Sequence, residues 1–392
     1  MTMNAYVNPL AGGDAVFAPS PLVDYIRARD FDRPTLVIHR ETVARQYRAL
    51  KSGLGRADIH YAVKANPARE VIEVLIAEGS HFDAASRGEI ELCLGLGAAP
   101  ETVSFGNTVK RASDIAFAHR AGITLFAADS EMELEKIADH APGAEVYIRL
   151  LVGATGADWP LSRKFGCAPE RALALMDHAA ALGLAPVGLS FHVGSQTRRA
   201  EMWRETLDRV SGVWAEARAA GHALSLINIG GGFPACYGEA IDAPESYAAQ
   251  VMAMVEPRFP GALRVMAEPG RGMVAEAGMI AAEVLLVSRK AEDDLCRWVY
   301  LDIGRFSGLA ETEGEAIRYQ FLSDRDHEAT GPCILAGPSC DSADVLYEKR
   351  PVALPLGLRA GDRVMIRNCG AYTSSYSSVG FNGFPPLDVV VI

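Results

Sequence analysis

Short apolar runs alternate with amphipathic stretches along the first two-thirds of the chain, and this alternation limits the possible folds more than any other feature. The apolar runs indicate eight strands, which end near Lys64, Asp83, Phe105, Ala127, Arg149, His192, Ile229 and Glu268. The stretches between them have helical periodicity, at residues 68–78, 87–97, 111–121, 131–140, 168–182, 200–220 and 245–257. Strands that alternate with helices form parallel sheets with helical crossovers. We therefore predict an α/β fold, a closed (β/α)8 TIM-like barrel over residues 40–280, with a doubly wound open sheet as the alternative.

The pattern changes after about residue 280. Apolar runs such as MIAAEVLLVSRKA, RWVYLDIG and DRVMIRNCG follow one another with Gly and Pro turns and without long helices between them. Such spacing is typical of antiparallel strands. We predict a C-terminal antiparallel β domain over residues 281–392, which the strand at 34–39 joins, so that residues 1–39 belong to it as well.

Composition excludes several classes of function. The net charge is −11 and no dense run of Lys and Arg occurs, which argues against nucleic acid or an anionic membrane as the main partner. No apolar stretch is long enough to span a bilayer, and the first residues lack the basic and apolar regions of a signal peptide. Seven scattered cysteines without C-x-x-C spacing indicate reduced thiols, not a disulfide frame or a metal site. We expect a cytoplasmic enzyme without a metal.

A barrel of this kind carries its active site at the carboxyl ends of its strands. Polar or charged residues occur there repeatedly: Lys64, Asp83, Asn107, Arg149, His192, the glycines 230–232 and Glu268. Each of them alone could be a solvated strand end. Together they predict one ring of functional groups at one mouth of the barrel.

Lys64 stands in the segment YAVKANP, where an apolar strand stops and a proline-bounded turn begins. The strand behind it, with Ile59, Tyr61 and Val63, is expected to be buried. Desolvation lowers the pKa of a lysine and makes its amine nucleophilic, so Lys64 is a candidate for covalent attachment to a carbonyl cofactor. The alternative is a strand-end lysine that reaches into solvent.

Three segments near the last strands have the chemistry of a phosphate site. NIGGGFP (228–234) allows close approach of backbone N–H groups, and Arg271 in EPGR (268–271) can bind a phosphate with two hydrogen bonds. In HVGSQ (192–196), His192 is a candidate to lie against a cofactor ring, and Ser195 to donate to phosphate. Glu268 is a candidate partner for a cationic ring nitrogen. The alternatives are a plain glycine turn, a surface Arg–Glu pair and a structural histidine.

Two segments of the β domain also contain reactive or binding groups. GPSCDSADVL (337–346) brings Cys340 and Asp341 side by side, a thiol that can donate a proton and a carboxylate that can bind an ammonium group. In the segment 370–384, Tyr372 could bind a phosphate and Phe381 could line a pocket. A buried thiol beside a turn aspartate, and core packing of the two aromatics, are the alternatives.

The motifs YAVKANP, HVGSQ, GGGFP, EPGR, CDSAD and GAYTSSYSSVGFNGF occur here in one order. In these motifs the chain resembles the fold-type III pyridoxal-phosphate decarboxylases, the ornithine, diaminopimelate and arginine decarboxylase family. Segments 298–312 and 337–349 resemble most closely the short bacterial ornithine or lysine/ornithine decarboxylases. The resemblance runs from about residue 30 to the C-terminus, and it implies an alanine-racemase-like barrel followed by a β domain.

The resemblance also implies a role for each matching residue. Lys64 would hold pyridoxal 5′-phosphate, Glu268 would face its ring nitrogen, and His192 would stack on the ring. The phosphate would be bound by Ser195, Gly231, Gly232, Arg271 and Tyr372, and a polar cluster near the lysine and the ring would contain Asp83, Glu89 and Arg149. Cys340 would return a proton to the substrate and Asp341 would hold its distal ammonium group, both acting in the site of a partner subunit. A homodimer with shared active sites is therefore implied.

The implied reaction is decarboxylation of L-ornithine to putrescine, with L-lysine to cadaverine as a second possibility. The segment 301–308 departs from the eukaryotic ornithine decarboxylases, and the final loop carries one more residue, which puts substrate length in doubt. Asp302 is a candidate second ammonium contact, with Asp341 and Phe381 as the other substrate residues. Alternatives are diaminopimelate or arginine decarboxylation, racemisation, or an inactive relative that acts as a regulator. The acidic Asp341 argues against a substrate with a distal carboxylate.

Overall fold

A computed structural model describes residues 20–152, 164–379 and 386–392. The chain divides into two compact units. One comprises Glu41–Ala235 and Ile241–Val274, and the other comprises the remainder of the chain. Each unit has its own sheet, and each is described here separately.

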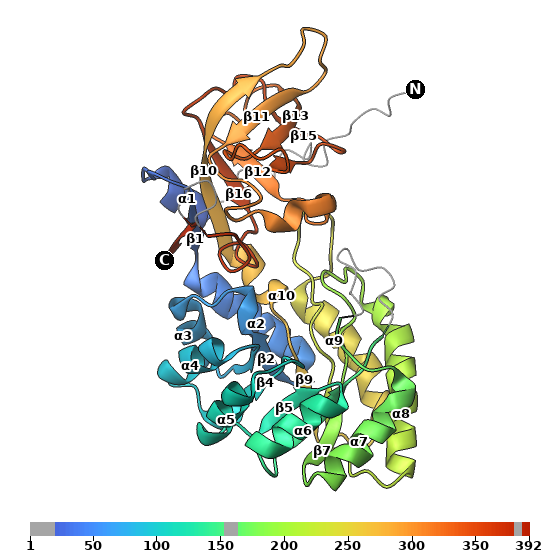
Figure 1. The fold of residues 1–392 in the computed structure, drawn as a ribbon. Coiled ribbons are helices and arrows are strands. Elements are labelled where there is room, and N and C mark those ends of the chain that lie inside the picture. The colour runs from blue at the N-terminus through green and yellow to red at the C-terminus, as the bar shows by residue number, and fades with distance from the viewer. Residues whose placement is uncertain (1–19, 153–163, 380–385) are drawn as a thin grey trace. The chain divides into compact units, whose positions relative to one another are not determined.

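Eight parallel strands of the first unit form the closed barrel that the sequence predicts (Figure 1). Its strands are β2 (Asp58–Ala62), β3 (His81–Ala84), β4 (Val103–Phe105), β5 (Leu125–Ala128), β6 (Glu145–Arg149), β7 (Ala185–Ser190), β8 (Leu226–Asn228) and β9 (Arg264–Ala267). Each strand pairs with the next, and β9 pairs with β2 to close the cylinder. The closure rules out the doubly wound open sheet.

Helices follow the strands and lie outside the barrel (Figure 1). They are α2 (Arg40–Leu54), α3 (Arg69–Ala77), α4 (Arg87–Gly95), α5 (Ala112–Arg120), α6 (Glu131–His140), α7 (Ala172–Ala181), α8 (Arg204–Ala219), α9 (Pro244–Val255) and the short α10 (Arg271–Val274). Their apolar residues recur every three or four positions, as Val43, Tyr47, Leu50 and Leu54 do in α2, and these side chains are buried. Helix formation and packing on the strands therefore follow from the same periodicity.

The inside of the barrel is filled by side chains from strands that are distant in sequence. Ala127, Tyr147, Leu226 and Met266 form one buried cluster from β5, β6, β8 and β9. A filled interior leaves ligand binding to the strand ends and the loops that follow them.

The second unit contains a sheet of nine described strands. They are β1 (Thr35–Ile38), β10 (Gly278–Ser288), β11 (Arg297–Leu301), β12 (Gln320–Ser323), β13 (Thr330–Ala336), β14 (Val345–Leu346), β15 (Val352–Pro355), β16 (Arg363–Arg367) and β17 (Asp388–Val391). β1, the strand expected at 34–39, pairs with β10. Most neighbouring strands pair antiparallel as expected, but the sheet is mixed, because β1 pairs with β17 and β11 with β13 in parallel. Parallel neighbours need long connections, and these pairs are joined by long stretches of chain instead of tight turns.

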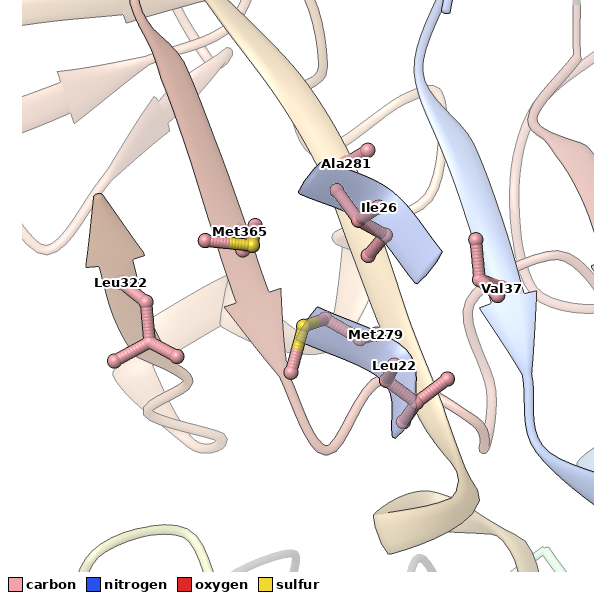
Figure 2. Close-up of a cluster of buried hydrophobic side chains, with 7 residues drawn as sticks. All are labelled: Leu22, Ile26, Val37, Met279, Ala281, Leu322 and Met365. Atoms are coloured by element: carbon pink, nitrogen blue, oxygen red, sulfur yellow. The ribbon is translucent and has the colours of Figure 1, made fainter. Parts of the chain in front are cut away.

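Helix α1 (Pro21–Arg27) covers part of this sheet (Figure 2). Its Leu22 and Ile26, four residues apart, face Val37, Met279 and Met365. The cluster joins the N-terminal segment to strands from the end of the chain. Within the described ranges, no helix is both long and apolar enough to cross a bilayer.

Candidate active site

Ionisable side chains gather where the barrel strands end. Asp83 belongs to β3, Arg149 ends β6, and His192 and Glu268 follow β7 and β9 closely. The charges of Lys64 and Arg149 act on both Asp83 and His192, and Glu268 acts on Asp83. The structure thus brings together the ring of residues that the sequence placed at the mouth.

Lys64 lies in a single 3₁₀ turn, η1 (Val63–Ala65), directly after β2. The strand behind it is buried as expected, with Ile59, Tyr61 and Val63 at most 1 % exposed. Lys64 itself is exposed, which agrees with the alternative of a strand-end lysine that reaches into solvent. The reason is its position on the turn beyond the strand, where the mouth opens and the side chain leaves the packed interior.

Asp83 is the most constrained acid of the mouth. It is 5 % exposed, and burial together with the charge of Glu268 holds the pKa of its carboxyl well above the usual range. Its Oδ1 has no hydrogen-bond partner among the described residues, and a Cβ at position 106 would lie 1.8 Å from that atom. Gly106 therefore makes room for a buried carboxyl that can still accept from a ligand or carry a proton.

Glu89 is fixed at the start of α4. Its Oε2 accepts a hydrogen bond from Ala85 N at 2.6 Å, and Ser86 Oγ accepts from Glu89 N at 3.4 Å. Ser86 thus caps the helix, and Glu89 reaches back to the residue before the cap, one position earlier than in a capping box. Burial raises the pKa of the Glu89 carboxyl, and the Lys64 charge opposes that shift.

Glu268 is held by Asn228, a residue to which the sequence analysis assigned no role. Asn228 is fully buried at the end of β8, donates from Nδ2 to Glu268 Oε1 at 2.5 Å, and accepts from Gly230 N at 2.9 Å. Glu268 N donates to Gly230 O at 2.7 Å. One amide thus links the carboxylate to the glycine loop. The sequence feature that could have indicated this role is a polar residue, Asn228, at the end of a buried strand and at the start of NIGGGFP.

His192 is a neutral ring in this setting. Burial, reinforced by the charges of Arg149 and Lys64, lowers the pKa of its imidazole to about 3. Its Nδ1 faces Gly231 N at 3.1 Å and accepts that hydrogen bond, which leaves the ring proton on Nε2. A neutral, anchored ring can lie against a flat cofactor without adding a positive charge.

Ser195, Arg271 and the glycines 230–232 form a second cluster beside this ring. Arg271 is 4 % exposed, and its Nε and Nη2 donate to Ser195 Oγ at 3.3 and 3.2 Å. Because the serine oxygen accepts from the guanidinium, its own hydrogen can be donated elsewhere. A Cβ on Gly231 would lie 2.7 Å from Glu268 O, and one on Gly232, where φ is +104°, would lie 2.6 Å from Gly194 O. Only glycine fits this close approach of the loops.

Gln196 fastens the two loops of this cluster, and the sequence analysis overlooked it although it is part of HVGSQ. Its Nε2 donates to Ala235 O at 2.5 Å and its Oε1 accepts from Ala235 N at 3.0 Å. Thr197 N adds a hydrogen bond to Gly232 O at 3.0 Å. The side-chain amide of Gln196 therefore pairs with the backbone of Ala235 as a peptide group does in a β-sheet. This pairing is apparent only once the two loops are folded.

The remaining predicted site residues belong to the second unit. Cys340 and Asp341 are exposed, and Asp341 Oδ1 accepts from Ala343 N at 2.8 Å. Tyr372 is partly buried with φ of +55°, an uncommon conformation for a side chain of this size. Phe381 lies outside the described residues. None of the seven cysteines, all of which are described, forms a disulfide.

Asp302 has its own surroundings in the second unit. Its Oδ1 accepts from Glu283 N at 2.8 Å, and burial raises the pKa of its carboxyl to about 6. The side chain lines two cavities of about 260 Å³ each, both of which Arg33 also lines. Its expected contact with a substrate ammonium group stays a prediction.

The residues of the barrel mouth fit pyridoxal 5′-phosphate. The Ser195–Arg271 pair offers hydrogen-bond donors for a phosphate, and the glycine loop leaves no side chain in the way. The anchored Glu268 offers a carboxylate for a ring nitrogen, and Lys64 offers an amine. Within the described part of the chain, no three His, Cys, Asp or Glu side chains are grouped as metal ligands.

Comparison with known families agrees with this fit. Residues 40–275 match the family model described as the pyridoxal-binding domain of pyridoxal-dependent decarboxylases. The chain belongs to this family. It is a pyridoxal-phosphate-dependent amino acid decarboxylase, similar to bacterial lysine/ornithine decarboxylases.

Relatives share both the sequence and the fold. The chain is 34 % identical to a lysine/ornithine decarboxylase of Selenomonas ruminantium, over 91 % of this chain and 89 % of that protein. The lysine/ornithine decarboxylase of Vibrio vulnificus, solved with putrescine, is 33 % identical, covers 95 % of this chain and 97 % of its own, and has a TM-score of 0.83. An arginine decarboxylase of Paramecium bursaria Chlorella virus, solved with agmatine, is 28 % identical, with coverage of 94 % and 100 % and a TM-score of 0.83.

Proposed function

We propose that this decarboxylase acts on a basic L-amino acid, releasing CO2 and putrescine from L-ornithine and, as a second reaction, cadaverine from L-lysine. The observation that carries the proposal is the barrel mouth, where Lys64, His192 and the Asn228-bound Glu268 adjoin the Ser195–Arg271 pair. The similarity to proteins named lysine/ornithine decarboxylase supports the choice of substrate.

The residues of the mouth would bind the cofactor as follows. Lys64 supplies the amine for covalent attachment, Glu268 faces the ring nitrogen, and His192 lies on the ring. Ser195, Gly231, Gly232 and Arg271 bind the phosphate, together with Tyr372 from the β domain. Asp83 and Arg149 complete the polar cluster around the lysine.

Pyridoxal 5′-phosphate, when bound, supplies an electron sink for the pair released from the bond between Cα and the carboxylate. Glu268 stabilises the positive charge on the ring nitrogen, and Asn228 holds that carboxylate in place. The neutral His192 orients the ring without competing for its charge. Lys64 accepts and returns protons around the substrate amine.

Cys340 donates the proton that replaces CO2 at Cα, and Asp341 holds the distal ammonium group of the substrate. Both act from the partner subunit of a homodimer, with the barrel over residues 40–280 and the β domain over 281–392 plus 1–39. Their exposure in a single chain supports this, since a residue that works in a partner's site must be reachable from outside. We place the enzyme in the cytoplasm, in keeping with its reduced cysteines.

The test is a CO2-release panel with L-ornithine, L-lysine, L-arginine and meso-diaminopimelate, reported as kcat/KM. The highest kcat/KM is expected for ornithine. The kcat/KM for lysine should be about 10–200-fold lower, which is the discrimination that one additional methylene group permits. Lys64→Ala is the control, expected to lose both turnover and the visible absorbance of the bound cofactor. CO2 release from none of the four substrates by the wild-type protein would refute the proposed function.

Arginine is the second candidate substrate, because the viral relative of the same fold was solved with agmatine. A higher kcat/KM for arginine than for ornithine in the same panel would favour it. A preference for meso-diaminopimelate would contradict the assignment of Asp341 to an ammonium group. Bound cofactor without turnover would indicate a regulatory relative.

A further inference from the structure

A buried carboxylate lies at the base of the loop that carries Cys340 and Asp341. Residues 337–344 connect β13 to β14, which pair at Ala336 and Val345. Asp344, the last residue of this loop, is 3 % exposed. Its Oδ1 accepts from Arg305 N at 2.7 Å, and its Oδ2 accepts from Ser339 Oγ at 2.7 Å and Ser339 N at 3.2 Å. The carboxylate therefore joins both sides of the loop to the segment after β11.

Two glycines leave the space that this carboxylate occupies. A Cβ on Gly304 would lie 2.1 Å from Asp344 Oδ1, and one on Gly337 would lie 2.3 Å from Oδ2. Neither glycine has the positive φ that would by itself require glycine. The contact with Asp344 is thus what excludes a side chain at both positions.

Further hydrogen bonds close the loop around Asp344. Its backbone O accepts from Gly337 N at 2.9 Å, and its backbone N donates to Asp341 O at 3.1 Å. Arg305 Nη1 donates to Ala343 O at 2.8 Å. The base of the loop is therefore fixed, whereas the side chains of Cys340 and Asp341 remain exposed.

We propose that Asp344 is the positioning residue of this loop, which fixes Cys340 and Asp341 relative to residues 304–305, and that positions 304 and 337 are glycine because of it. This gives the segment 301–308 a role that the motifs left open: it supplies the amide and the space that hold the loop. The inference rests on the proposed function for the chemistry of Cys340 and Asp341. Its geometric part is independent of that function.

The geometric part is tested by a double-mutant cycle measured as the thermal unfolding midpoint. Gly304→Ala should lower the midpoint by several degrees in the wild-type background, because the new methyl group meets the carboxylate. In Asp344→Ala it should lower the midpoint hardly at all, since the carboxylate is gone. Gly212→Ala in helix α8, where a Cβ meets nothing within 4 Å, is the control for added size; it should raise the midpoint slightly and equally in both backgrounds, because alanine favours a helix more than glycine does. Equal losses from Gly304→Ala in both backgrounds would overturn the inference.

The functional part is tested with Asp344→Asn and Asp344→Ala, and Ser342→Ala serves as the loop control. Both Asp344 variants should raise KM for ornithine and lower kcat at least tenfold, while the dissociation constant of pyridoxal 5′-phosphate stays within twofold. They should also lower the product ratio, measured as the amount of putrescine formed per CO2 released from ornithine. The asparagine variant keeps one acceptor oxygen and should lose less. Wild-type kinetics and product ratio in both variants would overturn the positioning role.

Failure of the proposed function has a different signature. If the wild-type protein converts none of the four substrates, the proposed function is refuted, whereas the double-mutant cycle still decides whether Asp344 requires the glycines. If Asp344→Ala does not fold, Gly304→Ala displaces the same carboxylate, and its effect on KM and product ratio decides the positioning role. In that case the cycle is measured with Asp344→Ser, whose shorter side chain also leaves the space beside residue 304.

Discussion

Acid should destabilise the barrel through His60, which is buried inside it. His60 in β2 is 5 % exposed and lies between His81 Nδ1, at 3.3 Å from its Nε2, and Ser104 Oγ, at 3.4 Å from its Nδ1. Burial, with a smaller contribution from His81, lowers the pKa of its imidazole from 6.5 to about 3. Neither of these neighbours is a carboxylate, and a hydrogen bond to the backbone of Phe82, which favours the cation, is outweighed by burial.

The sign follows from proton uptake. Between pH 6.5 and about 3 the unfolded chain binds a proton at His60 that the folded chain does not. The free energy of unfolding therefore falls as the pH is lowered through this window, and the full contribution is present above pH 6.5. With these two pKa values, acidification from pH 8 to pH 5 removes about 2 kcal/mol of stability through this one side chain.

The measurement compares wild type with His60→Asn in urea, followed by the fluorescence of Trp203 and Trp214, which are buried in the barrel unit. The variant should be less stable at pH 8 because the smaller side chain leaves a void. That deficit should shrink by about 2 kcal/mol at pH 5, since the variant has no ring to protonate. His192, whose pKa is also lowered to about 3, is present in both proteins and cancels in the difference. His140→Asn, at an exposed helix end, is the control. A deficit that stays constant from pH 8 to pH 5 would refute the reasoning.

Three further predictions concern the site. Asn228→Ala removes a hydrogen bond to a charged carboxylate, worth about 1.5–3 kcal/mol, so kcat/KM should fall about 10–150-fold with little change in KM. Gln196→Ala leaves the backbone of Ala235 unpaired and should weaken the binding of pyridoxal 5′-phosphate at least tenfold, measured by titrating the apoenzyme; unchanged affinity would contradict a role in the phosphate loops. Equimolar mixing of Lys64→Ala and Cys340→Ala protomers should restore about 25 % of wild-type activity, because half of the dimers carry one intact shared site; no recovery in a mixed dimer would argue against sharing.

The eight strands and the helices between them could be predicted because their signal is local. A parallel strand is buried on both faces and appears as a short apolar run, while a covering helix shows its buried side every three or four residues. Every predicted barrel strand is present. The six motifs quoted above end or follow strands, and each contains candidate site residues. Lys64, Asp83, Arg149, His192 and Glu268 meet at one mouth because parallel strands in a barrel all end on the same side.

Pairing in the second sheet could not be derived in the same way. The sequence indicates strands at 34–39 and after 280, but β1 pairs in parallel with β17 from the other end of the chain, and β11 with β13. Strand propensity depends on a few neighbouring residues, whereas strand order depends on which edges meet during folding. The sequence left open whether Lys64 is buried or reaches into solvent for a related reason, since the depth of a side chain depends on the loops around it.

The chain's periodicity was sufficient to specify a barrel, and the resemblance carried by its motifs implied pyridoxal-phosphate chemistry and most of the groups proposed for it. Folding was needed to reveal the residues that hold those groups in place. Asn228 meets Glu268 across 40 residues, Gln196 meets Ala235 across 39, and Asp344 meets Arg305 across 39. A buried amide or carboxylate has a role only through the donors and acceptors that surround it, and these come from segments that no local pattern connects.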